Sequence, residues 1–422
     1  MRFVVVKILN ILSKKILAKY KPVVIGVTGS VGKSSSKRAI CEVLKNKYRI
    51  AYNKSCYRMD IGIPLAIIGA ESGGRSVSKW LKIIFYAIEI IIKRTEYPKV
   101  LILEMGVDRP CDMEKMLEVV KPNIGVLTSI GEFPSHLKYF KNAKHILREK
   151  SMLIKFLRKK DVAILNCDDE AVKSLSENTR AKTIMYGFDK DAVIKAEEIF
   201  LGDRKWKIKS GLIGMSFKIS YQGTTVPFRL PFSLGRGHIY AVLSAVSVGI
   251  HFGYNLVEIS EILSNYKPLP GRMNLIEGVN NSLIVDDTFN SNPVSATVAL
   301  ETLQKLDTMR RIAVFSDMLE LGEYCEVGHR KIGKLVAKSA DLLFTYGKRS
   351  KFISEQAKKS GMKKNQIFHF DNLDDLSELL KNTIKSTDAV LVKGSRAMQM
   401  ENIVKEIMAE PEKAGELLVK YV

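Results

Sequence analysis

A glycine-rich turn leading into Lys33 and Ser34 is the segment whose residue types most directly indicate chemistry. Residues 22–27 form an apolar run typical of a buried strand, and Thr-Gly-Ser-Val-Gly-Lys-Ser-Ser follows it. In a strand–turn–helix unit of this kind, backbone N–H groups bind phosphate oxygens, the lysine reaches the β- and γ-phosphates, and the serine hydroxyl can reach Mg²⁺. Val27 stands where the longer form of this motif has its first glycine. We predict a nucleoside triphosphate site formed by Thr28, Gly29, Ser30, Gly32, Lys33, Ser34 and Ser35.

Charged and polar side chains follow other predicted strands and suit the same chemistry. Glu104 ends the apolar run 100–104, and a carboxylate beside a phosphate loop suits Mg²⁺ coordination. Lys393 follows another apolar run at a glycine turn. Because ligands of open α/β sheets bind at the carboxyl ends of strands, a cation there suits an anionic substrate. Further candidates placed after strands are Asp287 and Asn290, as nucleotide-side or hinge contacts, together with Asp317 and Arg396.

The elements that would position these residues alternate between strands and helices. Short β-branched runs separated by helical stretches predict a parallel sheet with both faces covered. Residues 192–234 differ, because short alternating stretches such as 205–209 and 214–221 suggest an antiparallel piece before a helix over 239–253. In the first part of the chain, strands are expected at 22–27, 100–104, 124–128 and 162–166, with a helix over 33–47.

A break at residues 266–272, Tyr-Lys-Pro-Leu-Pro-Gly-Arg, marks a linker between two domains. Arg272 follows this hinge and could reach the γ-phosphate when the domains close. Beyond it the alternation restarts, with strands expected at 282–286, 311–315, 341–345 and 389–392. We predict an α/β protein with three parts: an N-terminal amphipathic helix (1–21), a central P-loop parallel-sheet ATPase domain (22–268) and a Rossmann-like α/β C-terminal domain (269–422).

Composition and charge narrow the class of protein. The 422 residues are 46% hydrophobic and 27% charged, so the chain can bury sizeable cores and is not a disordered tail. The 67 lysines and arginines exceed the 45 acidic residues by 22, which favours anionic partners. No nucleic-acid-binding module is recognisable, so we expect no nucleic acid partner. The five cysteines form no CxxC pair, which argues against a disulfide framework or structural zinc and favours a cytoplasmic protein.

Two apolar segments with interspersed lysines raise the question of a membrane. Residues 1–20 place apolar side chains on one helical face, which fits either a helix docked on the first domain or a helix lying on anionic lipid. Residues 80–92 are too short to span a bilayer and contain Lys82 and Glu89. We favour docking for the first segment and keep peripheral membrane contact as an alternative.

Eight short motifs resemble those of the Mur ligase family in order and spacing. They are TGSVGKSSSK, ILEMG, TSIG with a later HL, LNCDD, PGRMN, DDTFNSNP, DMLELGE and VKGSR, and together they cover nearly all of residues 23–407. Within the family, DDTFNSNP and DMLELGE with the later His329 are most similar to the member that adds D-alanyl-D-alanine.

The resemblance implies a reaction in which ATP phosphorylates a peptide carboxylate and an amine attacks the resulting acyl phosphate. The expected substrates are an anionic UDP-muramoyl peptide and D-alanyl-D-alanine, in peptidoglycan precursor synthesis. The expected cofactors are ATP and Mg²⁺ at two sites, the second held with help from His136. Lys150 matches a family lysine that is carbamylated, and a carbamate on Lys150 would join Ser34, Glu104 and His136 as a metal-stabilising group.

The resemblance also implies roles for the remaining candidates. Lys33, Lys150, Arg272 and Lys393 are the expected catalytic residues. Asn166 would lie near the nucleotide, although a turn asparagine is the alternative reading of this position. Substrate binding would involve Asp317, Glu320, His329 and Arg396.

The sequence departs from the family pattern in three places. About 22 residues precede the phosphate loop, in the place where the family has a UDP-binding domain. We therefore expect UDP to be bound differently, and a partner that supplies the UDP-binding site is one way. Two family asparagines are replaced by His238 and Ala241, and an asparagine-rich stretch is lost at 56–64. These departures leave two alternatives: a related ligase with another acid or amino acid substrate, and a catalytically weakened ATP-binding scaffold.

Overall fold

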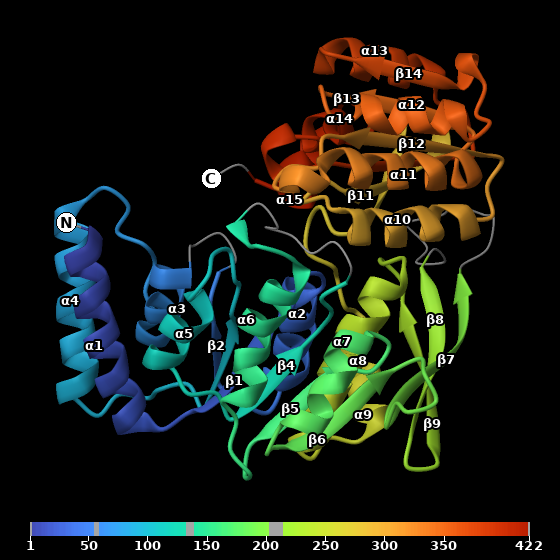
Figure 1. Cartoon of the computed structure of the whole chain (residues 1–422). Coiled ribbons are helices and arrows are strands. Elements are labelled where there is room, and N and C mark those ends of the chain that lie inside the picture. The colour runs from blue at the N-terminus through green and yellow to red at the C-terminus, as the bar shows by residue number, and fades with distance from the viewer. Residues whose placement is uncertain (1, 55–58, 132–138, 202–213, 421–422) are drawn as a thin grey trace.

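The computed structural model describes residues 2–54, 59–131, 139–201 and 214–420, and it contains two sheets with helices on both faces (Figure 1). The first sheet has the strand order β2-β3-β1-β4-β5-β6-β7-β8-β9. Its neighbours are parallel from β2 to β7, and the β7–β8 and β8–β9 pairs are antiparallel. The parallel sheet and an antiparallel piece are therefore confirmed, whereas the predicted stretch 205–209 lies outside the described residues.

The strands of this sheet are β1 Val23–Thr28, β2 Ile50–Tyr52, β3 Val100–Glu104, β4 Ile124–Leu127, β5 Val162–Asn166, β6 Lys182–Gly187, β7 Ile194–Leu201, β8 Met215–Tyr221 and β9 Thr224–Leu230. The helices around it are α1 Arg2–Tyr20, α2 Lys33–Leu44, α3 Met59–Ile68, α4 Val77–Ile92, α5 Asp112–Val119, α6 Ala143–Lys155, α7 Glu170–Lys173, α8 Arg236–His251 and α9 Leu256–Leu263. Strands β3, β4 and β5 are buried along their whole length, as expected where helices cover both faces.

Two apolar cores lie on the two faces of this sheet. One is formed with side chains of α1, α3, α4, α5 and α6, and the other with side chains of α2, α8 and α9. Because β1 and β3 are central, their carboxyl ends meet at one edge, which places Thr28 and Glu104 close to the phosphate loop.

The first helix is docked on the body of the protein, as the sequence favours. Leu9 and Ile16 are fully buried against α3, α4 and α5. Lys19 at the end of α1 donates from Nζ to the carbonyl oxygens of Ile90 and Ile91, both at 3.0 Å, and also to that of Lys93. These carbonyls lie at the end of α4, where helical carbonyl groups lack intrahelical partners. Lys19 thus ties the two helix ends together. No helix among the described residues has the length and apolar character needed to cross a bilayer.

The second sheet has the strand order β10-β11-β15-β12-β13-β14, with β10 antiparallel and the other neighbours parallel. Its strands are β10 Asn274–Gly278, β11 Ser282–Asp287, β12 Arg310–Ser316, β13 Leu342–Tyr346, β14 Ile367–Phe370 and β15 Asp388–Lys393. Its helices are α10 Pro293–Lys305, α11 Cys325–Ser339, α12 Lys351–Lys359, α13 Leu373–Thr383, α14 Glu401–Ile407 and α15 Ala414–Leu417. Helices α10, α11 and α12 cover one face, and α13 and α14 cover the other.

The connection between the two sheets runs from Ser264 to Met273, and the proposed domain boundary at 268/269 falls within it. Buried Asp286 holds this connection in place, because its carboxylate accepts hydrogen bonds from the backbone N–H of Gly271 (3.0 Å) and from the N–H and hydroxyl of Thr288. Burial raises the pKa of Asp286 to about 6. Figure 1 shows helix α10 on the side of the second unit that faces the first sheet. A cavity between the two sheets is lined both by residues of the phosphate loop and by residues of α10.

Candidate functional site

The phosphate loop joins β1 to α2 through two glycines with left-handed backbone conformations. Gly29 has φ 146° and Gly32 has φ 87°, and Gly32 directly precedes the first residue of α2. The N-terminal N–H groups of α2 therefore face the loop, and the helix dipole favours an anion there. The hydroxyl of Thr28 donates to the carbonyl oxygen of Met105 at 2.7 Å, which ties the loop to the end of β3.

Replacing Gly29 with alanine should deform this loop. A Cβ atom on Gly29 would lie 2.0 Å from Oγ1 of Thr128, and its φ of 146° is unfavourable for any side chain. We expect the free energy of unfolding to fall by about 2 to 4 kcal/mol and ATP affinity to fall at least tenfold. Gly74→Ala is the matched control, because its φ is also positive and nothing lies within 4 Å of the added atom. Chemical denaturation and ATP titration measure both effects, and wild-type behaviour of the Gly29 variant would contradict the prediction.

Glu104 is the buried acid of the site, and each of its polar groups has a partner. Its Oε1 accepts from the hydroxyl of Ser34 at 2.8 Å, and its Oε2 lies 3.1 Å from Nζ of Lys37. The side chain of Asn53 pairs with its backbone N–H and C=O at 2.8 and 2.9 Å. Burial alone would raise the pKa of Glu104, but the charges of Lys37, Lys33 and Arg272 outweigh it and lower the pKa to about 2. Glu104 is thus a carboxylate at all physiological pH values.

Lys37 and Asn53 belong to this network, although sequence reasoning did not select them. Lys37 lies one helical turn after Lys33, and this i, i+4 spacing places both on the same face of α2. That spacing was the available signal for Lys37. Asn53 follows the three-residue strand β2, and its role depends on a contact with β3 that no local pattern indicates.

Arg272 brings the second half of the chain to the phosphate loop. Its Nη2 donates to Oγ of Ser34 at 3.0 Å, and its guanidinium lies 4.0 Å from the ring centroid of Phe289. Burial lowers the pKa of Arg272, and Glu104 and Asp287 partly offset that effect. Its Nε has no hydrogen-bond partner although it is buried. A buried cation with an unsatisfied donor beside a phosphate loop fits a phosphate oxygen as its missing acceptor.

Lys393, Asp287 and Asn290 meet at the end of the second sheet. The register of β11 and β15 pairs Asp287 with Lys393, so both side chains leave the sheet at the same level. Lys393 is 1% exposed, and its Nζ contacts Oδ2 of Asp287 at 2.6 Å and the carbonyl oxygen of Asn290 at 2.9 Å. The sequence places Asp287 and Asn290 after one predicted strand and Lys393 after another, and the structure brings the three residues together.

His238 joins the two halves of the cleft from the first turn of α8. Its Nε2 lies 2.8 Å from the carbonyl oxygen of Arg272, and burial lowers the pKa of His238 to about 4. The ring is therefore neutral at pH 7, with Nε2 as the donor to that carbonyl. Nδ1 is then an acceptor, and it is buried without a partner. The cleft thus offers a second unsatisfied group, which fits a hydroxyl or amino donor of a bound ligand.

These residues line a single cavity of about 410 Å³ between the sheets. The predicted residues that the structure brings together in its lining are Ser30, Gly32, Lys33, Ser34, Ser35, Glu104, Arg272, Asp287, Asn290 and Lys393. Lys33 is partly exposed to this cavity, and desolvation there lowers its pKa against the opposing attraction of Glu104. The remaining lining residues include Asp108, which the sequence did not indicate.

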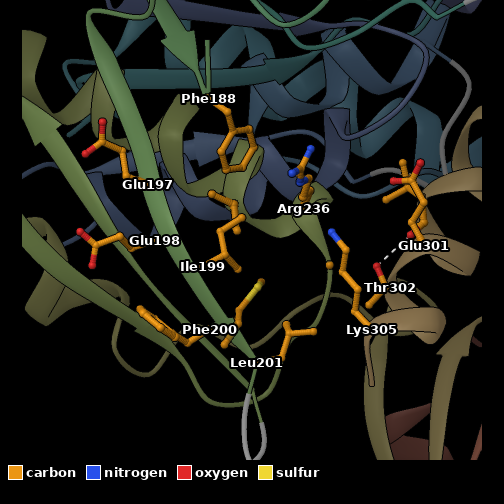
Figure 2. Close-up of a pocket in the computed structure, with 14 residues that line it drawn as sticks. Phe188, Glu197, Glu198, Ile199, Phe200, Leu201, Arg236, Glu301, Thr302 and Lys305 are labelled. Atoms are coloured by element: carbon orange, nitrogen blue, oxygen red, sulfur yellow. Dashed lines mark hydrogen bonds between the residues drawn. The ribbon is translucent and has the colours of Figure 1, made fainter. Parts of the chain in front are cut away.

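A second cavity, of about 660 Å³, lies next to the first and shares the lining residues Gly235 and Val298 with it. Figure 2 shows Phe188 and Arg236 on one side and Glu301, Thr302 and Lys305 of α10 on the other. The guanidinium of Arg236 lies 4.9 Å from the ring centroid of Phe188. An aromatic ring and a planar cation are suitable stacking partners for a nucleotide base.

The donors around Glu104 fit a magnesium ion. Mg²⁺ is held in nucleotide sites by one or two protein oxygens together with phosphate oxygens and waters, so it does not need a dense cluster of protein ligands. Among the described residues there is no group of three or more His, Cys, Asp or Glu side chains that could hold a metal by themselves. Ser34 and Glu104 supply adjacent oxygens, as the sequence predicts, and His136 lies outside the described residues.

Lys150 lies beneath the phosphate loop rather than on the surface. It extends from α6, is 1% exposed, and donates from Nζ to the carbonyl oxygen of Gly29 at 2.9 Å and to Oγ of Ser30 at 3.0 Å. Burial, foremost, and the nearby Lys33 lower the pKa of Lys150 well below its usual range. A neutral amine is the form that reacts with CO₂, so this environment fits the predicted carbamylation.

Asn166 ends β5 and is buried, but it does not line the phosphate cavity. Its Oδ1 accepts from the backbone N–H of Asp168 at 3.1 Å, which is the arrangement of a turn-forming asparagine. Asp168 in turn accepts from the hydroxyl of Tyr240 at 2.8 Å and from the N–H groups of Phe188 and Asp189. Asn166 therefore contributes to the second cavity indirectly, because it holds the turn in which Asp168 contacts Phe188, a lining residue of that cavity.

The residues of the DMLELGE segment form a separate group after β12. Asp317 accepts hydrogen bonds from the backbone N–H groups of Arg349 and Ser350, at 2.9 and 2.8 Å. His329 is fully buried, with Nε2 accepting from the N–H of Met318 at 3.0 Å and Nδ1 donating to the carbonyl oxygen of Cys325 at 2.7 Å. Asp317 and His329 thus fix the shape of the segment that carries Glu320.

Glu320 lines two cavities at once. One, of about 400 Å³, is also lined by Leu319, Gly322, Cys325 and Arg349. The other, of about 570 Å³, lies between α1, α3 and α5 and includes Asp108, which also lines the phosphate cavity. Arg396 pairs with Glu401 and donates to the carbonyl oxygen of Lys420, so the structure does not bring it into the phosphate cavity.

Comparison with known proteins gives matches along the whole chain. Residues 27–249 match the model of the Mur ligase middle domain, and residues 271–396 match that of the Mur ligase glutamate ligase domain. The chain is 27% identical over 402 residues to a UDP-N-acetylmuramoyl-tripeptide–D-alanyl-D-alanine ligase of Bacillus subtilis, covering 95% of this chain and 79% of that protein. It is 30% identical over 395 residues to the protein of that name from Buchnera aphidicola, covering 93% and 76%.

A solved structure extends these matches to the fold. The crystal structure of the MurF ligase from Thermotoga maritima in complex with ADP superposes with a TM-score of 0.79 at 22% identity, covering 97% of this chain and 84% of that one. The order of two α/β units along the chain is therefore common to both proteins.

Proposed function

The chain belongs to the Mur ligase family and is an ATP-dependent ligase, and from this premise we propose that it joins D-alanyl-D-alanine to the peptide of a UDP-N-acetylmuramoyl-tripeptide. This reaction makes a precursor of peptidoglycan, and we place it in the cytoplasm. The observation that carries the proposal is the meeting of Lys33, Glu104, Arg272 and Lys393 in one cavity, with the cations coming from both halves of the chain.

The first chemical step joins a carboxylate oxygen of the acceptor peptide to the γ-phosphorus of ATP. The bond from that phosphorus to the β–γ bridging oxygen breaks, which gives an acyl phosphate and ADP. Lys33 and Arg272 neutralise the charge that spreads over the transferred group, while the N–H groups of the loop and α2 orient it. Glu104 and Ser34 would hold Mg²⁺, which supplies a positive charge between the phosphates when it is bound.

The second step forms the amide. The free amine of D-alanyl-D-alanine attacks the carbonyl carbon of the acyl phosphate, phosphate leaves with the C–O bonding electrons, and the amine loses a proton. Lys393, held by Asp287 and Asn290, is positioned to stabilise the departing phosphate. Because Glu320 lies between two cavities, we place the dipeptide near it, in the 400 Å³ cavity lined by Arg349.

The nucleotide and the acceptor peptide are proposed to occupy the other two cavities. The base extends from the phosphate cavity toward the cavity of Phe188 and Arg236, since the two cavities share the lining residues Gly235 and Val298. The acceptor lies along the cleft of α1, α3 and α5, since Asp108 lines both this cleft and the phosphate cavity. Lys7 and Asn10 of α1 line this cleft, which would give the first helix a part in holding the acceptor.

Phosphate release with the two substrates, added singly and together, tests the proposed reaction. We expect release that requires ATP, Mg²⁺, the UDP-muramoyl-tripeptide and D-alanyl-D-alanine together, with an equal amount of amide product. Release that is independent of both substrates would contradict the proposal and indicate an ATPase. Release only with another acid or amino acid would identify a related ligase, and ATP binding without any release would identify the scaffold alternative.

A further inference from the structure

The outer face of α4 exposes a row of large apolar side chains. Val77, Leu81, Phe85, Ile88 and Ile92 recur at helical spacing, and Phe85 and Ile92 are 67% and 75% exposed. The opposite face of the same helix buries Trp80, Ile83, Ala87 and Ile90 in the core. The exposed row spans the 16 residues from Val77 to Ile92, about 22 Å of helix. A contiguous row of exposed apolar side chains of this size, on a surface that otherwise faces water, marks an interaction site.

The neighbouring helix α1 adds further apolar side chains and a strong positive charge. Phe3, Val4 and Ile11 are exposed on α1, and Figure 1 shows α1 and α4 side by side at the outer edge of the molecule. Five basic residues and no acidic residue lie in α1, and α4 has two lysines and one glutamate. Together the two helices carry a net charge of 5 + 2 − 1 = +6.

We propose that the α1–α4 edge binds the surface of an anionic lipid bilayer. The apolar row would enter the boundary between headgroups and acyl chains, while exposed Lys14, Lys15, Lys79 and Lys82 contact anionic headgroups. Phe85 and Tyr86 add aromatic rings, which are favoured at that depth. Neither helix would cross the bilayer.

Charge and packing favour a bilayer over a second copy of this chain. Two copies meeting through this edge would bring two surfaces of charge +6 together, which opposes association. The edge also does not need to fold on binding, because Lys19 joins the ends of α1 and α4 and the inner faces of both helices are already packed. The bilayer therefore meets a preformed surface, and binding carries no cost of ordering.

Vesicle flotation of the whole protein tests the proposal in the absence of substrates. With vesicles of phosphatidylcholine containing about one-third phosphatidylglycerol, we expect protein to float with the lipid at low salt and to be released at high salt. Phosphatidylcholine alone should bind at least tenfold less. A Phe85→Asp, Ile92→Asp double variant should reduce binding to the mixed vesicles at least tenfold.

A matched double variant controls for a general effect of added charge. Val257→Asp and Met309→Asp alter side chains that are 53% and 83% exposed and lie elsewhere, and this variant should bind vesicles as the wild type does. Both variants should keep the wild-type circular dichroism spectrum and melting temperature. Failure of wild-type protein to bind mixed vesicles, equal binding to both vesicle types, or equal loss in both double variants would each overturn the proposal. Light scattering that shows a dimer lost only in the Phe85, Ile92 variant would instead assign the edge to a second copy.

Discussion

Lys33→Ala should lower kcat/KM for ATP about a thousandfold or more, a loss of about 4 kcal/mol of transition-state stabilisation. Lys33 is the lysine of the phosphate loop, and it lines the cavity together with Glu104 and Arg272. Burial lowers the pKa of Lys33, and the ionised Glu104, whose pKa is about 2, opposes that effect and favours the charged ammonium group. Without the ammonium group, the negative charges of the transferred phosphoryl group and of Glu104 would be neutralised by one fewer cation. Steady-state phosphate release with both substrates measures the effect.

A surface lysine of the same helix region provides the matched control for this prediction. Lys45 is about half exposed and pairs with Glu42 on the surface, so Lys45→Ala should change kcat/KM less than twofold. Fluorescence or calorimetric titration with ATP separates binding from chemistry in the Lys33 variant. Near-normal turnover of Lys33→Ala, with Lys45→Ala equally affected or unaffected, would refute the assigned role of the phosphate loop.

Lys150→Met should lower activity about a hundredfold and remove a pH-dependent component of stability. In the wild type, Nζ of Lys150 holds Gly29 and Ser30, so its loss loosens the phosphate loop and costs about 2 to 3 kcal/mol in the transition state. Because burial lowers its pKa in the folded state, the unfolded chain binds more protons at this residue than the folded chain. The free energy of unfolding of the wild type therefore rises with pH, from the lowered folded pKa up to the ordinary lysine pKa near 10.5.

Denaturation at several pH values measures the contribution of Lys150 to the pH dependence of the free energy of unfolding. The Lys150→Met variant should show a flatter dependence of the free energy of unfolding on pH than the wild type across neutral and mildly alkaline conditions. Lys155→Met, at the last residue of α6, is the control, because its side chain is exposed. Identical slopes in the wild type and the Lys150 variant would contradict a buried, neutral amine.

Rescue experiments address the predicted carbamate on the same residue. If Lys150 carries a carbamate during turnover, formate or acetate should restore part of the activity of Lys150→Ala, because a small carboxylate can take the place of the missing anion. A fully active Lys150→Ala would remove the carbamate proposal, and it would also contradict the role of Lys150 in holding the loop.

Much of the site could be predicted because its residues end strongly apolar strands. Four site residues lie at the end of a run that is typical of a buried parallel strand: Thr28, Glu104, Asp287 and Lys393. Within each sheet, parallel strands bring such ends to the same edge. The strand ranges 100–104 and 162–166 coincide with β3 and β5, and the other expected strands within the described residues differ from the observed ones by one or two residues.

Other parts depend on contacts that no local pattern carries. Strands β2, β6, β10 and β14 were not expected, because they are short or lie at exposed positions where apolar alternation is weak. The spacing that places Lys37 on the same helix face as Lys33 does not predict its contact with Glu104, which joins a helix to a strand 67 residues away. Likewise, the sequence presents Lys150 as one more surface lysine, and only the packing of α6 under the loop shows that it is buried.

The docking of α1 also affects how the chain folds during its synthesis. Helix α1 leaves the ribosome before its partners α3, α4 and α5, the last of which ends at Val119. At synthesis rates of about 5 to 20 residues per second, roughly 5 to 20 seconds pass between the synthesis of this apolar, lysine-rich helix and the synthesis of the last of these segments. During that interval Leu9, Ile16 and their neighbours have no native surface to pack on. A chaperone or membrane that shelters this helix during translation would thus affect the yield of folded protein without changing the finished enzyme.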